Sequence, residues 1–140
     1  MSPALLPRVF VYGTLRPGGR NAALTGRFGL PGVQAATLPA FQLFHLSPEN
    51  YPVIVPGDPG ERVRGELLTY PPEVWARVLP LLDALEGVGE VPPLYHRQRV
   101  RVTLGAGTTE GAWTYVYARP ERLTLPGAAR VPGGDWPRRP

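Results

Sequence analysis

The chain has 140 residues, a formal net charge of +4 and a pI near 10, and 43% of its residues are hydrophobic. This length suits one packed unit, so we expect a single domain over residues 1–140. The sequence contains no Cys and no Lys, which excludes thiolate nucleophiles, Cys-bound zinc, Schiff-base chemistry and a P-loop lysine. Its two Ser and two His residues lack the spacing of a nucleophile elbow or a metal site, so we expect no metal and no cofactor.

Location and partners follow from what the sequence lacks. No run of about 18 apolar residues is present, and Met1–Leu6 is too short and uncharged for a secretory signal. We therefore expect a cytoplasmic protein that does not bind membranes. All fifteen basic residues are Arg, and they are spread along the chain, which predicts no nucleic-acid partner. An Arg-rich nucleic-acid binder stays an alternative, although basic and aromatic residues do not alternate as on a stacking surface.

Apolar runs between Pro- and Gly-rich breakers predict a series of short strands. Asn21 is expected to cap a brief helical turn that runs through Thr25, between the first two strands. The residues from Arg119 onward are rich in Pro and Gly, and we expect this tail to be mostly irregular and to wrap the surface. The expected strands are Arg8–Gly13, Val33–Leu38, Phe41–Leu46, Val53–Val55, Val63–Tyr70, Arg97–Leu104 and Ala112–Ala118.

The segment after Val63–Tyr70 has the pattern of one main helix. Pro71-Pro72 suits a first helical turn, and Gly87 stands where a C-terminal glycine often ends a helix. Pro80 lies inside the segment, so we expect a kink or two short helices that meet there. The buried face is expected to carry Val74, Val78, Leu81 and Leu85. Many strands and one main helix predict an α+β fold with a compact, mixed, barrel-like sheet and short flanking helices.

Two features are candidates for a functional site. The Tyr12-Gly13-Thr14-Leu15 loop leaves a buried strand and turns sharply, so its backbone N–H groups can point into one concavity that attracts an anion. Gly13 can let a ligand approach the backbone closely. The alternative is a plain structural turn.

Glu86 is the second candidate. It ends the predicted helix, where unpaired carbonyls and apolar neighbours raise the pKa of a carboxyl toward the range needed for proton transfer near neutrality. The alternative is a solvated surface glutamate. Two further acids stay open in the same way: Asp83 as a surface acid or a structural contact, and Glu66 as a residue that faces either a ligand or water.

Taken together, five segments in this order resemble the gamma-glutamylcyclotransferase-like family, over nearly the whole chain. They are Tyr12–Leu15, Gly65–Leu67, Leu82–Gly87, Tyr95–Arg97 and Gly133–Trp136. The resemblance implies a barrel-like mixed sheet with flanking helices. It also implies that Tyr12, Gly13, Thr14 and Leu15 bind a gamma-glutamyl group, that Glu86 is the proton acceptor, and that Tyr95 contributes to the substrate site with Arg97 behind it.

The implied reaction is an intramolecular aminolysis that needs no cofactor. The alpha-amine of a gamma-glutamyl compound attacks its own gamma-carbonyl, 5-oxoproline forms, and an amine or amino acid leaves. Family members act on glutathione, gamma-glutamyl amino acids, gamma-glutamyl amines or antibiotic intermediates, so the resemblance fixes the substrate only loosely. The Val88–Leu94 loop adjoins Glu86, so we expect that substrate choice can differ there. A non-catalytic small-molecule-binding module on the same fold is the alternative.

Overall fold

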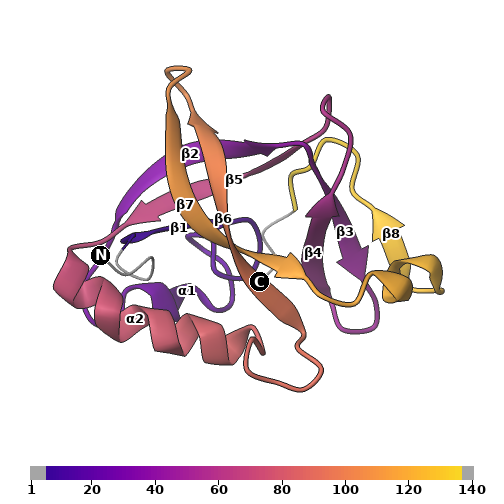
Figure 1. Ribbon diagram of the computed structural model, residues 1–140, viewed down its shortest axis with the longest axis horizontal. Helices are drawn as coiled ribbons and strands as arrows, with labels where there is room; N and C mark the ends of the chain where they lie inside the picture. Colours follow the sequence, from indigo (N-terminus) through magenta and orange to yellow (C-terminus); the bar gives the residue numbers. More distant parts are fainter. Residues whose placement is uncertain (1–5, 137–140) are drawn as a thin grey trace.

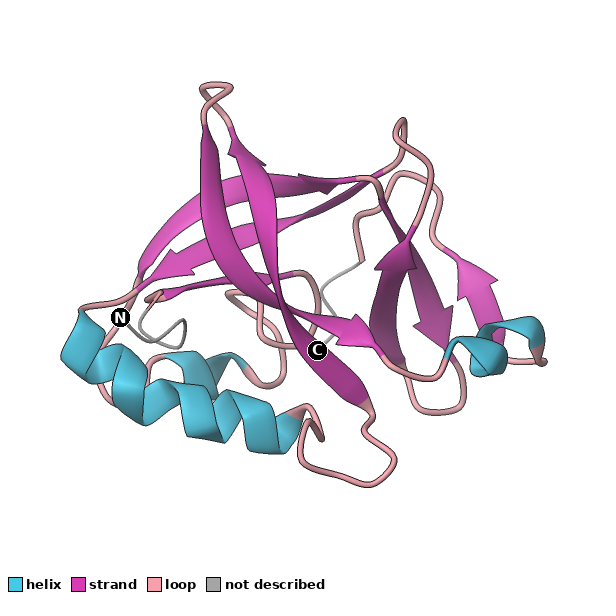
Figure 2. Cartoon of the chain, viewed as in Figure 1, coloured by secondary structure: helices cyan, strands magenta, loops and turns pink. Residues whose placement is uncertain are grey.

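The computed structural model describes residues 6–136. In this range, two α-helices, one 3-10 helix and eight strands follow one another along the chain (Figures 1 and 2). They are β1 (Arg8–Val11), α1 (Ala22–Thr25), β2 (Gly32–Pro39), β3 (Phe41–Leu46), β4 (Tyr51–Pro56), β5 (Arg62–Thr69), α2 (Pro72–Leu85), β6 (Tyr95–Leu104), β7 (Thr109–Tyr117), η2 (Pro120–Thr124) and β8 (Ala128–Arg130).

Five strands close into a barrel in the order β1-β5-β2-β6-β7. Neighbouring strands are antiparallel except β1 and β7, which pair in parallel at Val9 and Trp113. Gly65 of β5 allows β1 to approach closely, because a Cβ at this position would collide with the carbonyl oxygen of Val11. The predicted α+β fold with a mixed, barrel-like sheet is therefore confirmed.

A second sheet of three strands, in the order β4-β3-β8, lies at one side of the barrel (Figure 1). The β3–β4 hairpin pairs Phe41 with Pro56 at one end and Leu46 with Tyr51 at the other. Strand β8 comes from the tail and pairs with the opposite edge of β3. The tail is expected to be mostly irregular, and within it η2 and β8 are two regular elements that the sequence does not predict. Three residues that bond to an existing strand edge are too few to carry a periodic pattern.

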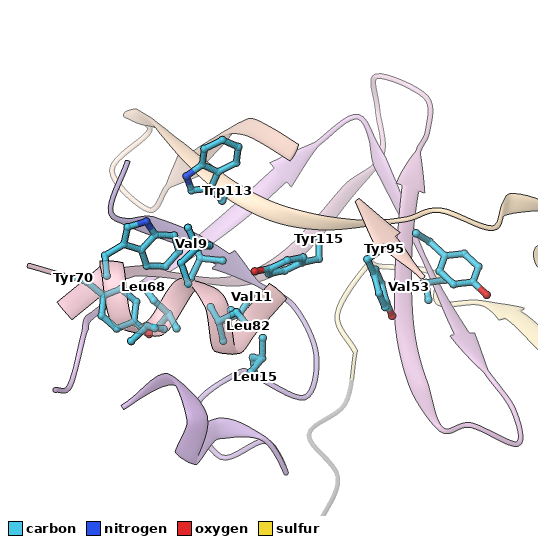
Figure 3. Packing of buried hydrophobic residues seen from close by; sticks show 14 of the residues in the cluster. Val9, Val11, Leu15, Val53, Leu68, Tyr70, Leu82, Tyr95, Trp113 and Tyr115 are labelled. Carbon is cyan, nitrogen blue, oxygen red and sulfur yellow. The ribbon is translucent and has the colours of Figure 1, made fainter. Parts of the chain in front are cut away.

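The buried side chains form two clusters, and the residues along β1, together with Tyr12 directly after it, alternate between them. Val9 and Val11 pack with α2, whereas Phe10 and Tyr12 pack with the other strands and the β3–β4 hairpin. This follows from the period of two in a strand, which sends successive side chains to opposite faces. We call the cluster that contains Val9, Val11 and the buried residues of α2 the α2 cluster. In Figure 3 it extends from Tyr70 at one end to Val53 and Tyr95 at the other, with Tyr115 between them.

Helix α2 is continuous through Pro80, so of the two predicted outcomes, a kink or two short helices, the second does not occur. Pro80 lies on the exposed side of the helix, and helix α2 begins at Pro72, as a proline-rich first turn predicts. The predicted buried face is wrong in part. The buried residues of α2 are Trp75, Val78, Leu79 and Leu82, whereas Leu85 is 41% exposed.

Asn21 stands directly before α1, as expected, but its side chain does not cap the helix. Its amide donates instead to the Thr14 Oγ1 atom, at 2.9 Å. Its backbone N–H donates to the Thr14 carbonyl oxygen, also at 2.9 Å. Asn21 therefore ties the start of α1 to the loop that follows β1.

Candidate functional site

A pocket of about 140 Å³ opens where the barrel, the second sheet and the end of α2 meet. It receives residues from the end of β1 and the loop after it, from the start of β4, from the end of α2, and from β6 and β7. The lining residues are Phe10, Val11, Tyr12, Gly13, Thr14, Leu15, Arg20, Asn21, Tyr51, Pro52, Leu85, Glu86, Leu94, Tyr95 and Tyr115. All six site residues predicted from the sequence therefore border one cavity.

The loop after β1 is a tight turn that leaves backbone donors available. The Arg16 N–H donates to the Gly13 carbonyl oxygen at 3.0 Å, which closes a four-residue turn. No described residue accepts a hydrogen bond from the N–H groups of Thr14 or Leu15. Since both residues line the pocket, their amides can bind an anionic group of a ligand.

Gly13 has a packing role in addition to its place in the pocket lining. A Cβ at Gly13 would collide with the Pro52 ring of β4. The absent side chain therefore makes room for Pro52, and this contact joins the loop to the second sheet.

Glu86 directly follows α2 and is the C-cap residue of this helix. The Glu86 N–H donates to Leu82 O at 3.0 Å, the Gly87 N–H to Ala84 O at 3.3 Å, and the Val88 N–H to Asp83 O at 3.1 Å. Gly87 has a φ of +64°, so these bonds form a Schellman motif, and the predicted C-terminal glycine is confirmed. The motif fixes the backbone of Glu86 at the edge of the pocket.

The Glu86 side chain lies in surroundings that favour its neutral form. Burial raises the pKa of Glu86 from 4.5 to about 7. Among residues 6–136, none forms a hydrogen bond or an ion pair with its carboxylate. A carboxyl group with this pKa and no competing partner can take up and release a proton near neutral pH.

Three buried tyrosines surround Glu86, and their hydroxyl protons are already engaged. The Tyr12 hydroxyl donates to Tyr115 O at 2.6 Å, the Tyr95 hydroxyl to Pro52 O at 3.0 Å, and the Tyr115 hydroxyl to Asp83 Oδ1 at 2.8 Å. Burial, and to a smaller extent the charge of Glu86, raises the pKa of each phenol. The phenols therefore stay neutral near pH 7, and Glu86 is the lining residue whose pKa lies close to this pH.

No group of three His, Asp or Glu side chains within residues 6–136 is arranged to hold a metal ion. None of the helices in this range is both long and apolar enough to cross a membrane.

Residues 9–138 match the sequence model of the family described as "Gamma-glutamyl cyclotransferase, AIG2-like". The chain belongs to this family. It is 34% identical over 128 residues to the Vibrio cholerae protein named "Putative gamma-glutamylcyclotransferase", covering 91% of this chain and 93% of that protein.

Solved structures of relatives share the fold. An AIG2-like protein of Mus musculus is 26% identical, with a TM-score of 0.64 over 95% of this chain and 96% of that chain. A protein of Arabidopsis thaliana is 30% identical, with a TM-score of 0.60 over 79% of this chain and 68% of that chain.

Two of the segments that carry the gamma-glutamylcyclotransferase resemblance meet at Arg16, which the sequence does not single out. The Arg16 guanidinium binds both carboxylate oxygens of Glu66, at 2.8 and 3.0 Å, and Asp135 Oδ1 at 2.7 Å. It also donates to the Trp136 carbonyl oxygen at 3.2 Å. Glu66 is therefore a structural partner of the loop, and so is Asp135. The only sign of this arrangement in the sequence is that it contains an arginine in this loop and two acids far from it along the chain.

Two more of the family segments meet behind the pocket. Asp83 forms an ion pair with Arg97 at 3.2 Å, in addition to its bond from Tyr115. The Arg97 guanidinium also lies over the Trp113 ring, 4.8 Å from its centre. Asp83 is thus a structural contact, one of the two roles that the sequence leaves open. Arg97 does not line the pocket and is connected to it through Asp83 and Tyr115.

Proposed function

We propose that this protein is a cofactor-independent gamma-glutamylcyclotransferase that converts the gamma-glutamyl group of a small molecule into 5-oxoproline. The observation that supports this most directly is the pairing of Glu86, whose pKa is about 7, with the available amides of Thr14 and Leu15 at one pocket. Family membership supports the same class of chemistry.

In the proposed reaction the substrate supplies its own nucleophile. Its alpha-amine is mostly protonated near pH 7, because such groups titrate near about 7.7–8.0. Glu86 accepts one proton from this ammonium group, and the free amine attacks the gamma-carbonyl carbon. A carbon–nitrogen bond forms within the substrate and closes a five-membered ring.

The second half of the proposed reaction returns the proton. The tetrahedral intermediate expels the leaving amine as the original gamma-amide bond breaks, and Glu86 gives its proton to the departing nitrogen. Glu86 then takes the second proton of the ring nitrogen, which leaves the neutral lactam of 5-oxoproline, and passes that proton to the free amine product. The amides of Thr14 and Leu15 hold either the substrate alpha-carboxylate or the developing oxyanion. Holding the glutamyl chain folded for ring closure supplies up to roughly 7–11 kcal/mol of the acceleration.

The direct test is release of 5-oxoproline by the purified protein from a panel of gamma-glutamyl amino acids and gamma-glutamyl amines. Glu86→Gln keeps the size and shape of the side chain but cannot accept the proton, so we expect release to fall by about 10²–10⁴-fold. Glu90→Gln is the matched control, because Glu90 is an exposed glutamate in the next loop that does not line the pocket.

Three results would contradict the proposal: no release from any member of the panel, full activity of Glu86→Gln, or an equal loss in both variants. Stable binding of gamma-glutamyl compounds without turnover would instead support the non-catalytic binding module. Far-ultraviolet circular dichroism of both variants checks that the fold is retained.

A further inference from the structure

One acidic and one basic residue line the pocket. Among the lining residues, Glu86 is the only acid and Arg20 the only base. The other arginine of this loop, Arg16, is buried, and its guanidinium is bound by Glu66 and Asp135. Arg20 is exposed, and no residue within 6–136 forms an ion pair or a hydrogen bond with its guanidinium. One cation at this pocket is thus available to a ligand.

The backbone on both sides of Arg20 is held in place. The Gly19 N–H donates to Arg16 O at 2.7 Å, and the Asn21 N–H donates to Thr14 O at 2.9 Å. Gly19 fits tightly, because a Cβ there would collide with the Thr14 carbonyl oxygen. The side chain of Arg20 therefore starts from a fixed point beside the loop that provides the free amides.

On the basis of the proposed function, we propose that Arg20 binds a carboxylate on the leaving amine. The preferred substrates are then gamma-glutamyl amino acids rather than gamma-glutamyl amines that lack an acidic group. The glutamyl ammonium group must lie at Glu86, and the amides of Thr14 and Leu15 can bind the other charged group of the same glutamyl unit. The leaving group extends toward solvent, where the exposed Arg20 matches a second carboxylate.

The test compares two substrates that differ by one carboxylate: gamma-glutamyl-alanine and gamma-glutamyl-ethylamine. The readout is kcat/KM for 5-oxoproline release by wild-type protein, Arg20→Gln and Arg27→Gln. Arg27 is the matched control, since it is an exposed arginine close in sequence that does not line the pocket.

We expect wild-type protein and Arg27→Gln to prefer gamma-glutamyl-alanine by roughly 10- to 100-fold, the range typical of a hydrogen bond to a charged group. In Arg20→Gln this ratio should fall close to one, mainly through a higher KM for gamma-glutamyl-alanine. Added salt should reduce the preference of the wild type in the same direction.

Two results would overturn this assignment while leaving the proposed function standing: a wild-type ratio near one, or an Arg20→Gln variant that loses activity equally on both substrates. The second result would assign Arg20 to the glutamyl end. No release from either substrate by wild-type protein would overturn the proposed function itself, and this inference with it.

Discussion

At the scale of single residues, the raised pKa of Glu86 implies that its negative charge destabilises the fold. The folded pKa is about 7 against an ordinary value of 4.5, so the folded protein binds more protons than the unfolded chain between these values. The free energy of unfolding should therefore fall as pH rises from 4.5 to 7. Glu86→Gln removes this titration, so the variant should be more stable than wild type at pH 8, by up to about 3 kcal/mol.

Urea unfolding at pH 8 and pH 4.5 tests this expectation. The stability difference between Glu86→Gln and wild type should be present at pH 8 and nearly absent at pH 4.5, while Glu90→Gln should follow the wild type at both. A Glu86→Gln variant that is less stable than wild type at pH 8 would show that the carboxylate is favourably solvated in the folded protein.

The position and role of a residue could be predicted from the sequence where its neighbours in the structure are also adjacent to it in the sequence. The position of Glu86 follows from the end of a helix and from Gly87, both of which are written in adjacent residues. Arg16 and Arg20 are four residues apart in the sequence, but one is bound by distant acids and the other is not. This difference is set by strand pairing in the barrel and by the path of the tail, so no local pattern contains it.

At the scale of elements, the orientation of α2 is the clearest case in which a periodic pattern predicted a buried face that is wrong in part. The predicted series passes through Val74, Val78 and Leu85, and the observed one passes through Trp75, Val78 and Leu82. Both series have the three- and four-residue steps of a helix, and they share Val78. Packing against the barrel selects the series that buries Trp75, and this leaves Leu85 beside the pocket.

The orientation of α2 predicts which leucine matters for stability. Leu82 is fully buried in the α2 cluster, so Leu82→Ala should lower the free energy of unfolding by about 2–5 kcal/mol. Leu85 is 41% exposed, so Leu85→Ala should cost less than about 1 kcal/mol. Urea unfolding of the two variants measures both effects, and a larger loss for Leu85→Ala would contradict the observed face.

At the scale of the whole molecule, the last described residues return to the loop that follows the first strand. Asp135 and the carbonyl oxygen of Trp136 bind Arg16, and the Arg64 N–H of β5 donates to Gly134 O at 2.7 Å. The substrate loop of the proposed site is thus held by segments more than a hundred residues apart. The sequence predicts the strands, and it points to the loop after β1 and to the Gly133–Trp136 segment. The contact between this loop and this segment depends on closure of the barrel.

Two adjacent glycines allow this closure to be tested by a matched pair of variants. Gly133 and Gly134 both have positive φ values, +89° and +66°, so alanine at either position costs about 1–2 kcal/mol of backbone strain. At Gly133 an added Cβ meets open space, but at Gly134 it would collide with the backbone carbonyl oxygen of Arg62. The collision should add about 1–3 kcal/mol for Gly134→Ala and displace Asp135 from Arg16. The free energy of unfolding in urea should therefore be highest for wild type, lower for Gly133→Ala and lowest for Gly134→Ala. A second measurement is 5-oxoproline release at a temperature where all three proteins are folded. It should fall most in Gly134→Ala. Equal stability of the two variants would show that the tail does not depend on its close approach to β5, because backbone strain alone affects both positions alike.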